Sequence, residues 1–162
     1  MSRAHPETRI GHVHLKVSNL DRSIAFYHDV MGFDLITRHG TQAAFLSAGG
    51  YHHHIGLNTW HSAGAAPGPR RAPGLYHVAF VYPDRRALAE ALQRVLDAGI
   101  EIDGAADHSV SEALYFRDPD QNGIEIYRDR PETDWPRDAE GNLAMVNAPL
   151  DIEALLAAPS RI

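Results

Sequence analysis

Three ionisable residues in separate parts of the chain have the side chains that a metal centre needs. His12 in "GHVHLKV", His77 in "YHVAFV" and Glu125 in "GIEIY" each alternate with apolar residues. Each is therefore expected on the polar face of a β-strand whose other face is buried. Two imidazoles and one carboxylate that converge form the 2-His-1-carboxylate triad, which binds Fe(II), Mn(II), Co(II) or Ni(II) and leaves coordination positions open. Open positions favour catalysis over a purely structural role.

Each of these residues alone has a simpler interpretation, as a solvated side chain on an antiparallel strand with one wet face. The matching positions of His12 and His77 in an internal repeat of the chain favour the metal site for the set. We therefore predict that His12, His77 and Glu125 are metal ligands.

A second group of imidazoles interrupts an apolar run in "YHHHIGLNTW". An imidazole has an ordinary pKa of about 6.5, so one of these histidines is expected to transfer protons beside the metal. Strand alternation leaves open which one does so. His53 shares its nominal face with Ile55, whereas His54 shares its face with Gly56, and a bulge at residues 49–50 would rotate this register.

The strands and helices that must position these side chains are predicted in the same order in both halves of the chain. Residues 12–35 predict a strand, an amphipathic helix that ends at a glycine, and a second strand, and residues 77–102 repeat the plan. Further short strands are predicted after each helix, in "FDLITRH", "AAFLSAG" and "YHHHIGLN" and then in "IEIDG", "EALYFRD" and "GIEIY". The order is βαβββ in both halves, which predicts an α+β fold.

We expect one domain over residues 1–162. Module one covers about 8–60, a linker rich in Gly, Ala and Pro covers 61–73, and module two covers about 74–128. A tail over 129–162 follows, in which "LDIEALLAA" predicts a short amphipathic helix.

Composition narrows the possible functions. The formal net charge of −6 disfavours nucleic acid as a partner, since proteins that bind nucleic acids carry clustered Lys and Arg. The chain has no cysteine, so disulfides, thiolate ligands and thiol nucleophiles are excluded and a metal site must use His and carboxylates. No signal-like or membrane-spanning stretch is recognised, which leads us to expect a cytoplasmic protein that does not bind membranes.

The stretches "HVHLKVSNLDRSIAFYHDVMGF", "GLYHVAF" and "DPDQNGIEIY" together resemble the vicinal oxygen chelate superfamily. That superfamily includes glyoxalase I, fosfomycin and bleomycin resistance proteins, and type I extradiol dioxygenases, and the resemblance covers roughly residues 10–130. It implies that paired βαβββ modules form a curved mixed-sheet cup around a divalent metal. The ligand positions fall on His12, His77 and Glu125.

The resemblance is nearest to the extradiol dioxygenases. Glyoxalase I usually adds a carboxylate ligand from the last strand of the first module, but residues 45–58 here contain no Asp or Glu. Extradiol enzymes instead carry a histidine there, in a context that "HHIG" resembles, which places His53 first and His54 second in the acid-base role. They also carry a histidine and a tyrosine that contact substrate and oxygen, and these positions resemble His108 and Tyr115.

The implied activity is cleavage of a catechol-type aromatic ring with O2 and a metal, most naturally Fe(II), with Mn(II), Ni(II), Co(II) or Zn(II) as alternatives. A homodimer is a further expectation, because one pair of modules resembles only the catalytic half of the two-domain extradiol enzymes. Two alternatives remain: a glyoxalase-like lyase, isomerase or thiol transferase on the same cup, and a resistance protein of the bleomycin or fosfomycin type. The nature of the activating metal would distinguish the enzymes from one another.

Overall fold

The computed structural model describes residues 3–157 and divides the chain into two compact units, Met1–Pro67 and Gly68–Ile162. The boundary falls inside the linker predicted at residues 61–73. The predicted tail extends to residue 162, and its residues 158–162 lie outside the described part of the chain.

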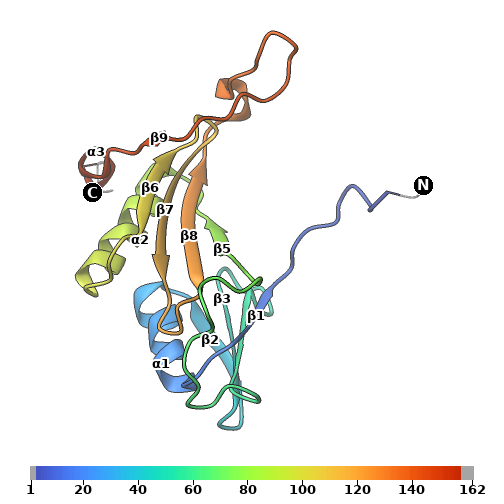
Figure 1. The fold of residues 1–162 in the computed structure, drawn as a ribbon, viewed down its shortest axis with the longest axis vertical. Coiled ribbons are helices and arrows are strands. Elements are labelled where there is room, and N and C mark those ends of the chain that lie inside the picture. The colour runs from blue at the N-terminus through green and yellow to red at the C-terminus, as the bar shows by residue number, and fades with distance from the viewer. Residues whose placement is uncertain (1–2, 158–162) are drawn as a thin grey trace. The chain divides into compact units, whose positions relative to one another are not determined.

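The first unit is a mixed four-stranded sheet with one helical segment (Figure 1). Its elements, in chain order, are β1 (Val13–Lys16), α1 (Leu20–Ala25), the π-helical η1 (Phe26–Val30), β2 (Asp34–His39), β3 (Ala43–Ser47) and β4 (Ile55–Asn58). The strand order is β1-β4-β3-β2, in which β1 is parallel to β4 and the other pairs are antiparallel.

The second unit repeats this topology and adds the tail. Its elements are β5 (Val78–Val81), α2 (Arg85–Asp97), β6 (Gly104–Asp107), β7 (Ser111–Arg117), β8 (Gly123–Asp129), the 3-10 helix η2 (Glu132–Asp134), β9 (Ala148–Pro149) and α3 (Ile152–Leu156). The strand order is β5-β8-β7-β6-β9, with β5 parallel to β8. Figure 1 shows β9 beside β6 and α3 close to α2. The predicted α+β class and the βαβββ order of both halves are confirmed.

Helix α2 shows how the sequence sets these elements. The Asp84 side chain caps its first turn by accepting a hydrogen bond from the Ala87 amide at 2.8 Å. Leu88, Leu92 and Val95 follow at helical spacing and are fully buried. The helix ends at Asp97, and Gly99, just beyond the C-cap residue Ala98, has a φ of 71° in the left-handed region. Along residues 3–157, no helix has the length and apolar character needed to span a membrane.

Two predicted strands begin later than expected. The strand expected from Tyr51 begins only at Ile55, and it follows a turn in which Gly49 and Gly50 both have positive φ. His52, His53 and His54 therefore lie in the connection before β4, where strand alternation does not decide their direction. The strand expected from Ile100 likewise begins at Gly104.

A buried ion cluster joins the strands of the second unit to its tail. Glu112 on β7 has an exposed fraction of only 4% and accepts from Arg85 at 3.2 Å, Arg128 at 2.8 Å and Arg130 at 3.5 Å. The Arg85 guanidinium also donates to the Ala154 carbonyl of α3 at 3.0 Å. One buried carboxylate thus holds three arginines that come from the start of α2, from β8 and from the chain just after β8.

We predict that Glu112→Gln lowers the free energy of unfolding by about 2–4 kcal/mol, because it leaves three guanidinium groups around a neutral amide. Urea denaturation followed by circular dichroism measures the change. Glu101→Gln, at an exposed position of the same unit, is the matched control and should stay within about 0.5 kcal/mol of wild type. A Glu112→Gln variant as stable as the control would contradict the role given to the cluster.

Candidate active site

The centre of the candidate site in the second unit is a histidine and glutamate pair. Strands β5 and β8 are parallel neighbours with Ala79 opposite Glu125. His77 lies just before β5, and its Nε2 is 2.9 Å from Oε2 of Glu125. The Glu125 side chain is only 13% exposed. A carboxylate with so little contact with water needs a cation or strong hydrogen-bond donors beside it.

Gly123 makes this close approach possible. A Cβ atom at this position would lie 2.1 Å from the Tyr76 carbonyl oxygen and 3.0 Å from the Cβ of His77. Any side chain at this position would push the backbone of residues 76 and 77 away from β8. The glycine that opens "GIEIY" therefore keeps His77 within reach of Glu125.

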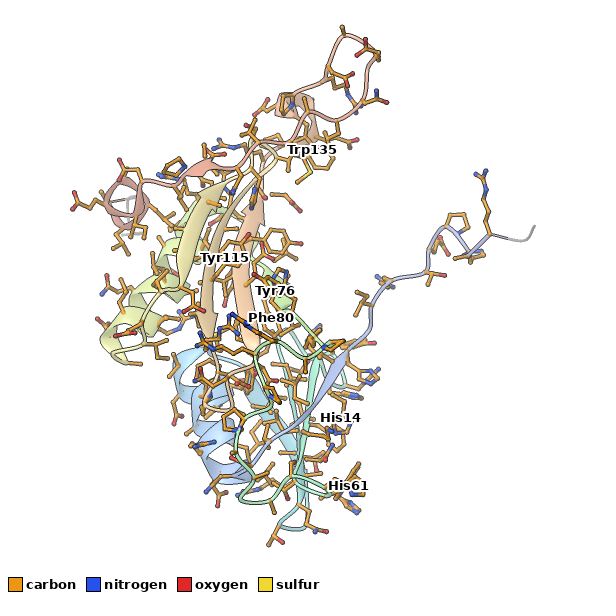
Figure 2. The ribbon with its side chains drawn as sticks, viewed as in Figure 1. His14, His61, Tyr76, Phe80, Tyr115 and Trp135 are labelled. Atoms are coloured by element: carbon orange, nitrogen blue, oxygen red, sulfur yellow. The ribbon has the colours of Figure 1, made fainter. Side chains whose placement is uncertain are left out.

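Tyr115 supplies a hydroxyl to the same carboxylate. It lies directly opposite Glu125 in the antiparallel pair of β7 and β8, and its hydroxyl donates to Oε1 of Glu125 at 3.2 Å. Burial, and then the neighbouring Glu125 carboxylate, raise the pKa of Tyr115 to about 12. Tyr115 is therefore a protonated hydrogen-bond donor at neutral pH. Figure 2 shows its side chain projecting from the central part of this sheet.

His108 continues the network from the other side of Tyr115. It follows β6, and its Nε2 is 2.9 Å from the Tyr115 hydroxyl oxygen. Its Nδ1 is 3.0 Å from the Val146 carbonyl oxygen in the tail. The four residues proposed from sequence in this half of the chain thus form one connected chain of contacts: His77, Glu125, Tyr115 and His108.

The first unit holds a separate group of imidazoles. The ring centroids of His12 and His53 are 4.5 Å apart, and His53 also lies 5.1 Å from the Phe45 ring. Nδ1 of His52 and Nδ1 of His53 are 2.7 Å apart, so these two rings share one hydrogen bond. Burial, and then the charge of His12, lower the pKa of His53. His53 is thus biased towards its neutral form, which can accept a proton.

His54 points in another direction. Its Nδ1 accepts from the Ala48 amide at 3.3 Å and lies 3.0 Å from the Ser47 hydroxyl. Its ring packs 4.8 Å from that of Tyr51. Of the two candidates for the acid-base role, His53 is the one that the structure places beside His12.

His14 is a residue that the sequence reasoning left out of the site. Its ring lies against Gly56, where a Cβ atom would come within 2.9 Å of its Cγ. It also contacts the rings of Phe45, at 5.8 Å, and Trp60, at 5.7 Å. Burial, and then His12, lower its pKa. The sequence does contain a signal for including His14 in the site: His12 and His14 alternate in "HVHLKV", which places both on one face of the strand.

The metal ligands predicted from sequence are thus divided between the units, with His12 in the first and His77 and Glu125 in the second. Nowhere in the described residues do three or more His, Asp or Glu side chains form a group that could hold a metal. Two features of the second unit do suit a metal. The 2.9 Å between Nε2 and Oε2 matches two neighbouring ligands at about 2.1 Å from one ion, which lie about 3 Å apart. His77 Nδ1 is buried and has no hydrogen-bond partner among the described residues, so Nε2 is the ring atom aimed at a partner.

Two βαβββ units that carry histidines, a glutamate and a tyrosine at these positions define a protein of the glyoxalase type. The family profile agrees: the chain belongs to the Glyoxalase/Bleomycin resistance protein/Dioxygenase superfamily, whose model matches residues 9–126. The expected family resemblance is thereby confirmed.

Curated relatives include two ring-cleaving enzymes. A catechol-2,3-dioxygenase of Bacillus subtilis is 46% identical over 156 residues, which cover 96% of this chain and 54% of the relative. A biphenyl-2,3-diol 1,2-dioxygenase of Rhodococcus globerulus is 32% identical over 124 residues, which cover 75% of this chain and 63% of the relative. The chain therefore spans between half and two thirds of the length of these two enzymes.

A solved structure shares the fold. The crystal structure of a glyoxalase/dioxygenase from Nostoc punctiforme matches with a TM-score of 0.64 and 21% identity, over 81% of this chain and 99% of that one.

We predict that Tyr115 ionises with a pKa of about 12 in the metal-free protein, compared with about 10 for a free tyrosine. Because the folded protein holds this proton more tightly than the unfolded chain, the stability that Tyr115 contributes falls as the pH rises from about 10 to about 12. The difference in tyrosinate absorbance between wild type and Tyr115→Phe isolates this group. Glu125→Gln removes the neighbouring charge and should bring the value closer to about 10. A Tyr115 that titrates like a free tyrosine in wild type would contradict the burial and contacts described.

Proposed function

We propose that the protein is a metal-dependent extradiol dioxygenase, which cleaves a catechol-type ring beside its two hydroxyl groups and places both atoms of O2 in the product. The observation that carries the proposal is the connected set His77, Glu125, Tyr115 and His108. It offers two metal donors, then a protonated hydroxyl and then an imidazole, and each group lies within 3.2 Å of the next. The identity to a catechol-2,3-dioxygenase supports the same reaction class.

The metal would be held by His77 and Glu125 of the second unit and by His12 of the first. His12 and His77 occupy equivalent places in the repeat, because each directly precedes the first residue of a strand that pairs in parallel with the last strand of its βαβββ module. Fe(II) suits two imidazoles and one carboxylate, and when bound it supplies the path for electrons from a chelated catechol to O2. The contact between His77 Nε2 and Glu125 Oε2 would be replaced by a metal held by both residues.

The remaining residues would handle protons and orient the substrate. His53 would accept a proton from a catechol hydroxyl and return it later, and its lowered pKa keeps the ring in the neutral form that can accept. Tyr115 and His108 would orient the substrate through hydrogen bonds. The chain between Phe45 and Asn58 contains no carboxylate that could add a fourth ligand, which favours ring cleavage over glyoxalase chemistry. A homodimer remains a prediction from the sequence.

The metal assignment predicts that His12→Ala, His77→Ala and Glu125→Ala each weaken metal affinity by at least about 100-fold, since loss of a hydrogen bond to a ligand alone already costs 10- to 100-fold. Anaerobic reconstitution with Fe(II), followed by metal analysis, measures the loss. His39→Ala, at the exposed end of β2, is the matched control and should bind one equivalent like wild type. Full retention of metal by His77→Ala would refute the assignment.

The reaction class predicts that the Fe(II) form consumes O2 and gives a yellow ring-opened product with a panel of catechols. The Ni(II) form should not isomerise the glutathione hemithioacetal of methylglyoxal. An oxygen electrode and absorbance spectroscopy measure both reactions. Isomerase activity without oxygen uptake would contradict the dioxygenase assignment and favour a glyoxalase-like enzyme.

A matched pair of variants tests the acid-base role within this experiment. His53→Gln should lower kcat by about 100-fold or more, the range for loss of a general base. His54→Gln should stay close to wild type, because His54 faces Ser47 and Ala48. The reverse result would move the role to His54.

A further inference from the structure

We propose that the backbone carbonyl of Val146, in the C-terminal segment, is a positioning group that fixes the tautomer of His108 and thereby the direction of the hydrogen bond between His108 and Tyr115. The tautomer follows from the contacts alone. Its consequence for catalysis rests on the proposed function.

The segment reaches His108 because it joins the sheet. Strand β9 pairs with β6, with Pro149 opposite Ala106 and Ala148 opposite Asp107. One step further along, the Val146 amide donates to the His108 carbonyl at 3.3 Å, while His108 Nδ1 lies 3.0 Å from the Val146 carbonyl oxygen. Val146 therefore contacts both the backbone and the ring of His108. Figure 1 shows the chain returning from the loop after β8 to run beside β6.

Other contacts hold both ends of this segment in place. At its start, the Arg130 amide donates to the Val110 carbonyl at 2.7 Å, and the Arg130 guanidinium contacts Asp107 at 2.6 Å. At its end, Leu155 of α3 is fully buried and Arg85 donates to the Ala154 carbonyl. The Val146 carbonyl is thus presented by a segment that is anchored on both sides of it.

The tautomer follows from the chemistry of the two partners. A carbonyl oxygen can only accept a hydrogen bond, so Nδ1 of His108 must carry a proton to contact Val146. In a neutral imidazole the other nitrogen, Nε2, is then an acceptor, and it lies 2.9 Å from the Tyr115 hydroxyl. The tail therefore makes His108 an acceptor towards Tyr115.

The direction of this bond decides what Tyr115 can do. Its single proton has two candidate acceptors, His108 Nε2 at 2.9 Å and Glu125 Oε1 at 3.2 Å. When Glu125 serves as a metal ligand, His108 is the acceptor that remains free. Tyr115 then donates to His108 and offers its oxygen lone pairs to a substrate hydroxyl. With the opposite tautomer, His108 would donate and Tyr115 would have to present its proton instead.

The side chain of Val146 is not needed for this role. The residue is 48% exposed, and both contacts to His108 use backbone atoms. Val146→Ala therefore keeps the positioning group and is the matched control. Val146→Pro removes the amide that donates to His108 and restricts the backbone at the residue whose carbonyl faces the ring.

The test records 15N spectra of the histidine rings in the full-length, metal-free protein at neutral pH, with His108 assigned by comparison with His108→Gln. Wild type and Val146→Ala should show His108 protonated at Nδ1 and unprotonated at Nε2, and Val146→Pro should show a mixture of tautomers. In the Fe(II) form, Val146→Pro should lower kcat by about tenfold or more, as for a displaced catalytic group, with KM and metal content close to those of wild type.

A wild-type His108 protonated at Nε2, either alone or together with Nδ1, would overturn the proposal, and so would a Val146→Pro spectrum identical to that of wild type. Should Val146→Pro fail to fold, deletion of Asn147 shifts the Val146 carbonyl without introducing a proline and carries the same expectations. If wild type gives the expected spectra but cleaves no catechol, the positioning role of Val146 is supported and the proposed dioxygenase function is overturned. The two proposals can therefore fail separately.

Discussion

The second unit depends on the close parallel pairing of β5 and β8 around the partly buried Glu125 carboxylate. Gly123 lets residues 76 and 77 approach β8, and this brings His77 Nε2 to 2.9 Å from Glu125. Tyr115 approaches the same carboxylate from β7, and burial and then this carboxylate raise its pKa and keep it protonated. A buried carboxylate is costly unless its partners are fixed, so the strands of this sheet are constrained to keep donors around it.

The arrangement of strands was largely predictable from local signals. The cap, the apolar spacing and the terminal glycine of α2 are all local to that helix. The order βαβββ was predicted because such helical spacing and the alternation of the strands recur in both halves of the chain. The start of β4 was harder to predict, because the strand-like run "YHHHIGLN" extends back over residues that follow the turn at Gly49 and Gly50 and precede the strand. The change from α1 to the π-helical η1 within one apolar pattern likewise carries no signal in residue spacing.

Within the candidate site, contacts between residues on paired strands were easier to predict than contacts made by residues in connections. Tyr115 and Glu125 are ten residues apart along a hairpin, so antiparallel pairing places them opposite each other. His108 could be proposed from sequence, but its partner Val146 could not, since this contact joins the His108 ring to a backbone carbonyl 38 positions away. Nothing in the side chain of Val146 indicates what its carbonyl does.

A comparison of the two units through their strand registers explains why they carry different chemistry. In the second unit the small Ala79 lies opposite Glu125, whereas in the first unit His14 lies opposite Gly56. The position of the carboxylate in one unit is thus a glycine in the other, and the imidazole of His14 fills the space where a Cβ would stand.

The next strand shows the same divergence. Phe45 faces Gly56 in the first unit as Tyr115 faces Glu125 in the second, so an apolar ring replaces the hydroxyl where there is no carboxylate to receive it. His12 and His77 alone keep the same residue type at these equivalent positions. The first unit therefore offers imidazoles and aromatic rings, and the second offers the carboxylate with its hydrogen-bond donors. Of these equivalent positions, the first unit contributes one histidine to the proposed ligand set, and the second contributes one histidine and the glutamate.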